Sequence, residues 1–217
     1  MTPENLPAAL ELVGPAVADA LSKAPPAHTL EENQALGTIE RRVLLLVERD
    51  AHFLPGYEPI EHEWSFGRGD EGPVDLGSFR LKGRVDRIDS GPQGLVVIDY
   101  KGSSATPVAK FADEGKVQLQ LYAVVVSRRL ECPVAGGLYR SLSVAKDRGF
   151  IDAAYAGPGV VRTDRLDRAS IDRLLAQAVD AAAEAVEGMR AGRIAPIPDK
   201  RRCSYCIAAG FCDEALR

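Results

Sequence analysis

The sequence lacks the features of a membrane-spanning or exported protein. No run approaches the roughly 20 consecutive apolar residues that a transmembrane helix needs. The first residues, Met1-Thr2-Pro3-Glu4, also lack the basic and apolar blocks of a secretory signal. We therefore expect a cytoplasmic protein without a membrane partner. The 217 residues, 46% of them hydrophobic, are enough to bury one full core.

The sequence also lacks an excess of positive charge. Its 27 Lys and Arg residues stand against 31 Asp and Glu residues, and the formal net charge is -4. Such a protein has no overall attraction for nucleic acid, so a polyanion would have to bind to local basic groups or to metal. The best candidate for a phosphate contact is the run Lys200-Arg201-Arg202, although such runs are more often solvated surface.

Cysteine is absent before Cys132, which excludes a disulfide framework spread along the chain. Three cysteines, Cys203, Cys206 and Cys212, fall close to the C-terminus in the spacing C-x2-C-x5-C. Two cysteines three residues apart can face one metal ion from a tight turn, so the pattern favours zinc or an iron-sulfur cluster. The alternative is that these are thiols with no ligand role.

Residues 1–28 predict an N-terminal helix and a linker. An apolar stretch from Leu6 to Leu21 is followed by Ala24-Pro25-Pro26-Ala27, which cannot continue a helix. Thr29 to Glu32 then fits a capping box, and apolar residues follow at helical spacing. We expect an amphipathic helix over residues 31–49.

The rest of the chain alternates between strand and helix patterns. Strands are predicted near residues 57–66, 76–89, 95–101, 134–142 and 150–162, and helices over residues 113–128 and 171–189. This order predicts an α/β fold with a mixed central sheet flanked by helices. We expect the core over residues 29–198 and a cysteine-rich tail over residues 199–217.

Three ionisable residues are predicted to converge on one β-hairpin. If Gly91-Pro92-Gln93-Gly94 closes a symmetric turn, paired residue numbers sum to 185 and Asp86 faces Asp99, with Lys101 on the same side. Two opposed carboxylates repel unless a cation lies between them, and oxygen ligands favour Mg²⁺ or Mn²⁺. Lys101 could then orient or deprotonate a water.

The alternative is a surface salt bridge between Asp99 and Lys101, which would add little to the free energy of unfolding. However, the aspartates stand among Val85, Ile88 and Val97, which lie on both faces of their strands. Apolar residues on both faces are typical of central strands covered by helices on both sides. A strand with one face exposed to solvent would not need apolar residues on both faces.

The motifs G-x-x-D-R-x-D (Gly83–Asp89), D-Y-K-G (Asp99–Gly102) and Q-x-x-x-Y (Gln118–Tyr122) together resemble the RecB-family nuclease domain of the PD-(D/E)xK superfamily. The resemblance covers roughly residues 31 to 217. The cysteine tail is similar to the iron-sulfur nuclease domains of AddB-type helicase-nuclease subunits and CRISPR-associated exonucleases. This implies a restriction-endonuclease-like fold and a metal-dependent DNA exonuclease of repair or recombination, with a helicase subunit or an upstream helicase region as partner.

The resemblance also implies roles for individual residues. Asp86 and Asp99 would ligate Mg²⁺ or Mn²⁺ with the backbone carbonyl of Tyr100, and Lys101 would serve the attacking water. Gln118 and Tyr122, four residues apart on one helix face, would reach the site or the DNA backbone. The alternative makes Tyr122 a core aromatic and Gln118 a cap of a neighbouring carbonyl.

Two features depart from the family pattern. Arg41 stands four residues after Gly37, where similar proteins carry a metal-ligating histidine, and a guanidinium cannot ligate metal. The site could work with fewer ligands, Glu40 or another acid could complete it, or the domain could be a silent DNA-binding scaffold in which Arg41 contacts phosphate. The upstream region also has no cysteine for the fourth ligand of a 4Fe-4S cluster.

Overall fold

A six-stranded mixed sheet forms the centre of the computed structural model, which describes residues 2–26, 29–69, 72–102, 105–142, 147–196 and 203–212. The strands lie in the order β1-β4-β5-β6-β7-β8, and β2 and β3 pair separately. The strands are β1 (Glu58–Phe66), β2 (Val74–Asp75), β3 (Arg80–Leu81), β4 (Gly83–Gly91), β5 (Gly94–Lys101), β6 (Val134–Ser141), β7 (Asp147–Asp152) and β8 (Arg165–Leu166). The helices are α1 (Leu6–Ser22), α2 (Leu30–Asp50), α3 (Gln118–Arg129) and α4 (Arg168–Arg190).

The predicted mixed sheet flanked by helices is confirmed, as is the helix after the linker. α2 begins at a capping box in which Thr29 Oγ1 accepts from the Glu32 amide at 3.1 Å and Glu32 Oε2 accepts from the Thr29 amide at 3.0 Å. No helix within the described ranges is long and apolar enough to cross a membrane.

Three predicted boundaries were wrong, each because the chain turns locally. The strand predicted over residues 76–89 starts instead with the turn between β2 and β3, where Gly77 has a φ of +99°, and continues as two strands, β3 and β4. The helix predicted from residue 113 starts only at Gln118, after a turn containing Gly115 with a φ of +59°. Both values lie in the left-handed region that glycine tolerates best. The strand predicted over residues 150–162 ends at Asp152, where the Tyr155 amide bonds back to its carbonyl.

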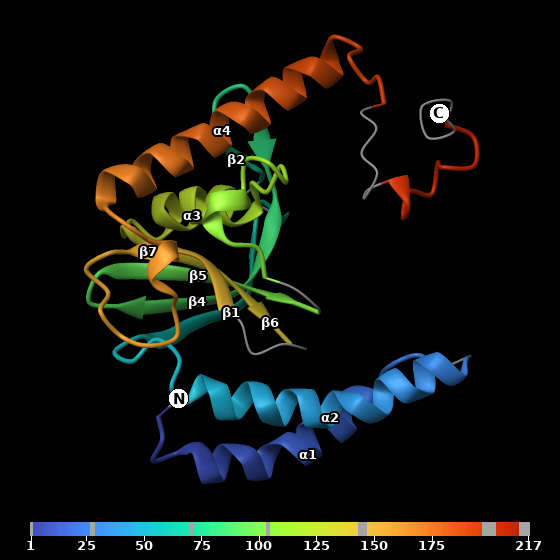
Figure 1. The fold of residues 1–217 in the computed structure, drawn as a ribbon, viewed down its shortest axis with the longest axis vertical. Helices are drawn as coiled ribbons and strands as arrows, with labels where there is room; N and C mark the ends of the chain where they lie inside the picture. Colours follow the sequence, from blue (N-terminus) through green and yellow to red (C-terminus); the bar gives the residue numbers. More distant parts are fainter. Residues whose placement is uncertain are drawn as a thin grey trace.

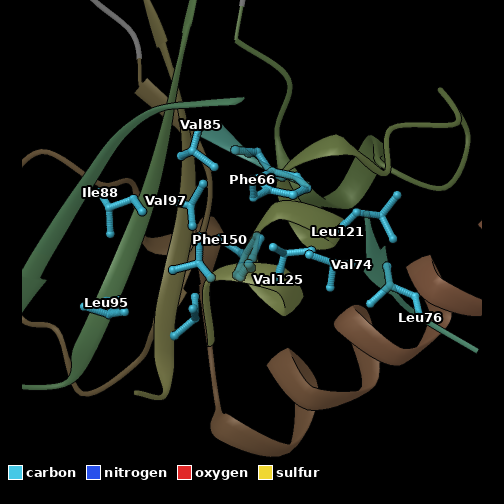
Figure 2. Close-up of a cluster of buried hydrophobic side chains, with 14 of the residues drawn as sticks. Phe66, Val74, Leu76, Val85, Ile88, Leu95, Val97, Leu121, Val125 and Phe150 are labelled. Carbon is cyan, nitrogen blue, oxygen red and sulfur yellow. The ribbon is translucent and has the colours of Figure 1, made fainter. Parts of the chain in front are cut away.

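The larger core lies between the sheet and the pair α3 and α4. Figure 2 shows Val97 of β5 and Phe150 of β7 directed toward Val125 of α3. Phe150, Val97 and Val125 are all fully buried. This packing fixes α3 against β5 and β6, and α4 packs on α3 in turn.

The opposite face of the sheet has a smaller core. Val96 and Ile98 of β5 are fully buried there against Phe53, Leu54 and Tyr155. These covering residues come from loops that lie between the sheet and the helices α1 and α2. Beyond the loops lie α1 and α2, which run antiparallel to each other, and only the C-terminal end of α2 reaches the sheet (Figure 1).

The end of α2 is tied to the sheet by a buried ionic cluster, defined here as Asp50, Arg87, Asp89, Arg140 and Asp147. Arg87 donates two hydrogen bonds to Asp89, at 2.6 and 2.7 Å, and one to Asp50 at 2.8 Å. Arg140 is fully buried and also donates to Asp50. Its Nε lies 3.6 Å from Asp147 Oδ1. Asp50 is therefore an acceptor shared by two arginines on different strands.

Replacing Asp50 by alanine should destabilise the protein by roughly 3 kcal/mol, because both arginines lose an acceptor in a buried place. Urea unfolding monitored by circular dichroism measures the change. The matched control is Asp172→Ala, which removes an exposed ion pair with Arg168 at 2.6 Å and should cost less than about 1 kcal/mol. Equal losses in the two variants would contradict a structural role of the cluster.

Candidate active site

The β4–β5 hairpin has the predicted register. Five pairs of residues, from Gly91–Gly94 to Arg87–Ile98, have numbers that sum to 185. Gly94 closes the turn with a φ of +118°, and a Cβ there would lie 2.2 Å from the Pro133 carbonyl oxygen. A larger residue would clash with backbone, so glycine is required at this point of the hairpin.

At the end of this ladder the side chain of Asp86 takes the place of a backbone partner. Its Oδ2 accepts a hydrogen bond from the backbone N–H of Tyr100 at 2.8 Å. The two acids were predicted to face each other across the hairpin. In the structure, the Asp86 carboxylate bonds to the β5 backbone at Tyr100, the residue next to Asp99. The two carboxylates are close enough that the charge of Asp86 raises the pKa of Asp99.

Asp99 is the most buried acid of this group, with 4% of its surface exposed. Burial raises the pKa of Asp99 above its ordinary value, and the nearby Asp86 adds to the rise, while the ion pair with Lys101 opposes it. The net direction is upward. The site therefore disfavours the negative charge of Asp99 unless more positive charge is brought in.

Lys101 supplies part of that positive charge. Its Nζ lies 2.6 Å from Asp99 Oδ2 and donates a hydrogen bond to Gln118 Oε1 at 3.1 Å. The side chain is 36% exposed, so the ammonium group lies between the buried acid and solvent. The Asp99–Lys101 pair is thus not a surface salt bridge, which was the alternative prediction, because the carboxylate of Asp99 is almost fully buried.

The two residues of the Q-x-x-x-Y motif lie at the start of α3 but have different surroundings. Gln118 contacts Lys101 through its side-chain oxygen. The ring of Tyr122 packs edge-on against Phe66 at a centroid distance of 5.6 Å and lies next to Gly83 at the start of β4. Gln118 is placed at the group of charges, and Tyr122 packs on the core while staying half-buried.

Tyr100 offers its backbone to the site and its side chain to the other face of the sheet. Its N–H is engaged by Asp86, as described, and its hydroxyl lies 3.5 Å from Arg87 Nη1. The role of its carbonyl as a metal ligand stays a prediction.

The residues considered as a further ligand are on α2, apart from the hairpin. Arg41 is exposed, and the Glu40 carboxylate lies about 3.4 Å from the position that a Cβ on Gly14 of α1 would take. Figure 1 shows this middle part of α2 running alongside α1, with only the end of the helix near the sheet. Neither residue is brought to Asp86 and Asp99 in this arrangement.

The tail residues predicted to bind metal or DNA are only partly described. Cys203 and Cys206 form a turn, in which the Cys206 amide bonds to the Cys203 carbonyl at 3.3 Å, and Cys206 is exposed. In the part of the chain that the structure describes, no three His, Cys, Asp or Glu side chains are gathered as a metal site, and Cys212 does not join the turn as a third ligand. Lys200, Arg201 and Arg202 lie outside the described residues.

The ionic cluster on the other face of β4 was not predicted from the sequence. Arg87 and Asp89 belong to the G-x-x-D-R-x-D motif, yet they bond to each other and to Asp50 instead of pointing to Asp86 and Asp99. The available signal was alternation: residues 87 and 89 have opposite parity to Asp86 in a strand whose two faces are both buried.

The hairpin acids fit a hard divalent cation. All donors are carboxylate oxygens, and burial raises the pKa of Asp99, so a further positive charge beside it would stabilise its ionised form. Mg²⁺ is commonly held by one or two carboxylates, with water and substrate phosphate completing its shell. Two aspartates are therefore a sufficient protein contribution, although no third acid or histidine joins them among the described residues.

Comparison with known proteins agrees with this chemistry. The chain matches the family described as the PD-(D/E)XK nuclease superfamily over residues 2–213, which includes α1, the hairpin and the cysteines. No curated protein matches the chain. Members of the superfamily are nucleases that generally cleave DNA and typically use Mg²⁺ or Mn²⁺. Because the match covers nearly all of its residues, the chain belongs to the PD-(D/E)XK nuclease superfamily.

Proposed function

We propose that this protein is a metal-dependent deoxyribonuclease that degrades DNA as an exonuclease in repair or recombination. The observation that carries the proposal is the convergence of Asp86, Asp99 and Lys101 at one end of the β4–β5 hairpin, with Gln118 contacting the lysine. Hydrolysis of a phosphodiester requires a site for a cation and a group that orients water, and this arrangement offers both.

The chain's own residues would divide the chemistry as follows. A bound Mg²⁺ or Mn²⁺ would supply charge neutralisation of the scissile phosphate and a more acidic water. Asp86 and Asp99 would hold the cation, with Asp86 oriented by the Tyr100 amide. Lys101 would orient the attacking water or stabilise charge on a phosphoryl oxygen, and Gln118 would hold the lysine side chain in place.

The finer parts of the proposal depend on the motifs. Exonucleolytic action, a role in repair and a helicase partner follow from the resemblance to RecB-family domains, and the cytoplasmic location stays an expectation from the sequence pattern. The division into residues 1–28, 29–198 and 199–217, DNA contacts by Arg41 and Lys200-Arg201-Arg202, and zinc or an iron-sulfur cluster at Cys203, Cys206 and Cys212 are predictions from composition, charge and cysteine spacing.

One observation favours a second candidate function, a silent nuclease-fold domain that binds DNA without cutting it. Arg41 replaces the ligating histidine and is exposed on α2, and no third ligand lies at the hairpin among the described residues. Mn²⁺ calorimetry separates the two functions. A nuclease should bind Mn²⁺ and lose that binding in Asp99→Asn, whereas DNA affinity without any Mn²⁺ binding in the wild type would favour the scaffold.

Lys101→Met and Asp99→Asn should each lower the rate of Mg²⁺- or Mn²⁺-dependent degradation of linear DNA by at least about 100-fold, because each removes a group that acts on the reacting atoms. Release of acid-soluble nucleotides measures the rate, and circular dichroism confirms the fold. The control is Lys110→Met, an exposed lysine outside the site. Unchanged activity in both site variants would refute the assignment.

Asp99→Asn should also change how stability depends on pH in the protein without metal. The folded-state pKa of Asp99 is raised above the unfolded value of about 3.9, so ionisation of this group destabilises the fold as the pH rises from that value through the folded pKa. The stability of Asp99→Asn relative to the wild type should therefore increase from acidic to neutral pH.

Urea unfolding at several pH values, in the presence of a chelator, measures this difference. Saturating Mn²⁺ should remove the advantage of the asparagine variant, because only the wild type gains free energy from binding the cation. A stability difference that stays constant across the pH range would contradict the raised pKa of Asp99.

A further inference from the structure

The ammonium group of Lys101 has a third neighbour besides Asp99 and Gln118. Its Nζ lies over the ring of Tyr139, 5.1 Å from the ring centroid. This distance is within the range in which a cation is attracted by the negative face of an aromatic ring. Tyr139 belongs to β6, so a strand outside the hairpin contributes to the surroundings of the lysine.

The position of the Tyr139 ring is fixed by the sheet. Asp99 and Tyr139 are partners in the parallel pairing of β5 and β6, so the tyrosine stands directly beside the buried acid. The ring is 2% exposed and is held edge-on by Phe111 at a centroid distance of 5.9 Å. Tyr139 is therefore a rigid surface under the lysine and not a mobile side chain.

The hydroxyl of Tyr139 is unsuited to proton transfer. Burial raises the pKa of Tyr139 to about 12, the neighbouring charge of Asp99 adds to the rise, and a hydrogen bond with the backbone of Leu119 opposes it. The phenol thus stays neutral at any physiological pH. What Tyr139 presents to Lys101 is the face of its ring.

We propose that Tyr139 is a positioning residue for Lys101, whose ring holds the ammonium group in place when a cation occupies Asp86 and Asp99. This inference rests on the proposed function and adds to it a residue from β6. Without metal, the closest partner of the lysine is Asp99 at 2.6 Å. A divalent cation on Asp99 would compete for that carboxylate and repel the ammonium group.

Two contacts of Lys101 do not compete with the cation for Asp99: the amide oxygen of Gln118 and the ring of Tyr139. Both partners are uncharged, so they can attract the lysine without drawing metal away from the acids. The ring of Tyr139 is itself shielded from water, and the ammonium group lies between this ring and solvent, where a cation–π contact is weaker than in a fully buried place. Tyr139 and Gln118 together would hold the Lys101 ammonium group beside the cation site of Asp86 and Asp99.

The experiment replaces Tyr139 by phenylalanine and by phenylalanines with one, two and three ring fluorines, introduced by nonsense suppression. Fluorine weakens the negative ring face with little change in shape, so a role in packing alone would not respond to the series. Tyr139→Phe should keep kcat close to that of the wild type, and kcat should then fall stepwise, by roughly fivefold to tenfold over the series. KM and the melting temperature should stay constant across the fluorinated variants.

A second measurement does not need activity. In ¹³C-labelled protein saturated with Mg²⁺, the ε-methylene protons of Lys101, assigned by their loss in Lys101→Arg, should be shifted upfield by the ring and return to ordinary values in Tyr139→Leu. A constant kcat across the fluorinated series, or an unshifted Lys101 signal in the wild type with Mg²⁺, would overturn the role of Tyr139. If the wild type proves inactive, the proposed nuclease function fails, and the lysine signal still decides whether Tyr139 holds Lys101.

Discussion

The close approach of Asp86 and Asp99 is the constraint on which the rest of the site depends. Asp99 is nearly fully buried, and Asp86 accepts a hydrogen bond from the Tyr100 amide of β5. Burial raises the pKa of Asp99, and the charge of Asp86 adds to this rise. The free-energy cost of placing the ionised Asp99 here must be offset by the packing of the surrounding sheet. Lys101 relieves part of this cost in the absence of metal, and a divalent cation would relieve more of it.

β4 carries a second set of charges on its other face, where the outcome is different. Arg87, Asp89 and Asp50 satisfy one another through short hydrogen bonds, and Arg140 joins them. That face holds its positive and negative groups in contact, while Nε and Nη2 of Arg140 are buried without a hydrogen bond to the described residues. Within the described ranges, the acidic pair on the α3 face has no such arginine partner, and its ion pair is the one between Asp99 and Lys101. This contrast between faces separates a structural cluster from a reactive one.

Much of the site could be predicted because the length and type of a hairpin turn set the register of its two strands. The numbers of Asp86 and Asp99 sum to 185 about the turn, and the structure keeps that register up to Arg87 and Ile98. The lean of Asp86 onto Tyr100 could not be predicted, since it depends on where the ladder ends. The contact of Tyr139 with Lys101 depends on β5 and β6 being parallel neighbours, which a linear pattern does not specify. The turn at the start of the strand predicted over residues 76–89 was missed because apolar residues continue through it around Gly77.

The attachment of α2 has a mechanical consequence. α1 and α2 form an arm that reaches the sheet at its end, and Asp50 in its last turn bonds to Arg87, the residue next to Asp86. A partner that tilts this arm would exert force on β4 one residue away from the acidic pair. The ionic contact between Asp50 and Arg87 thus joins this arm to the same strand that carries Asp86.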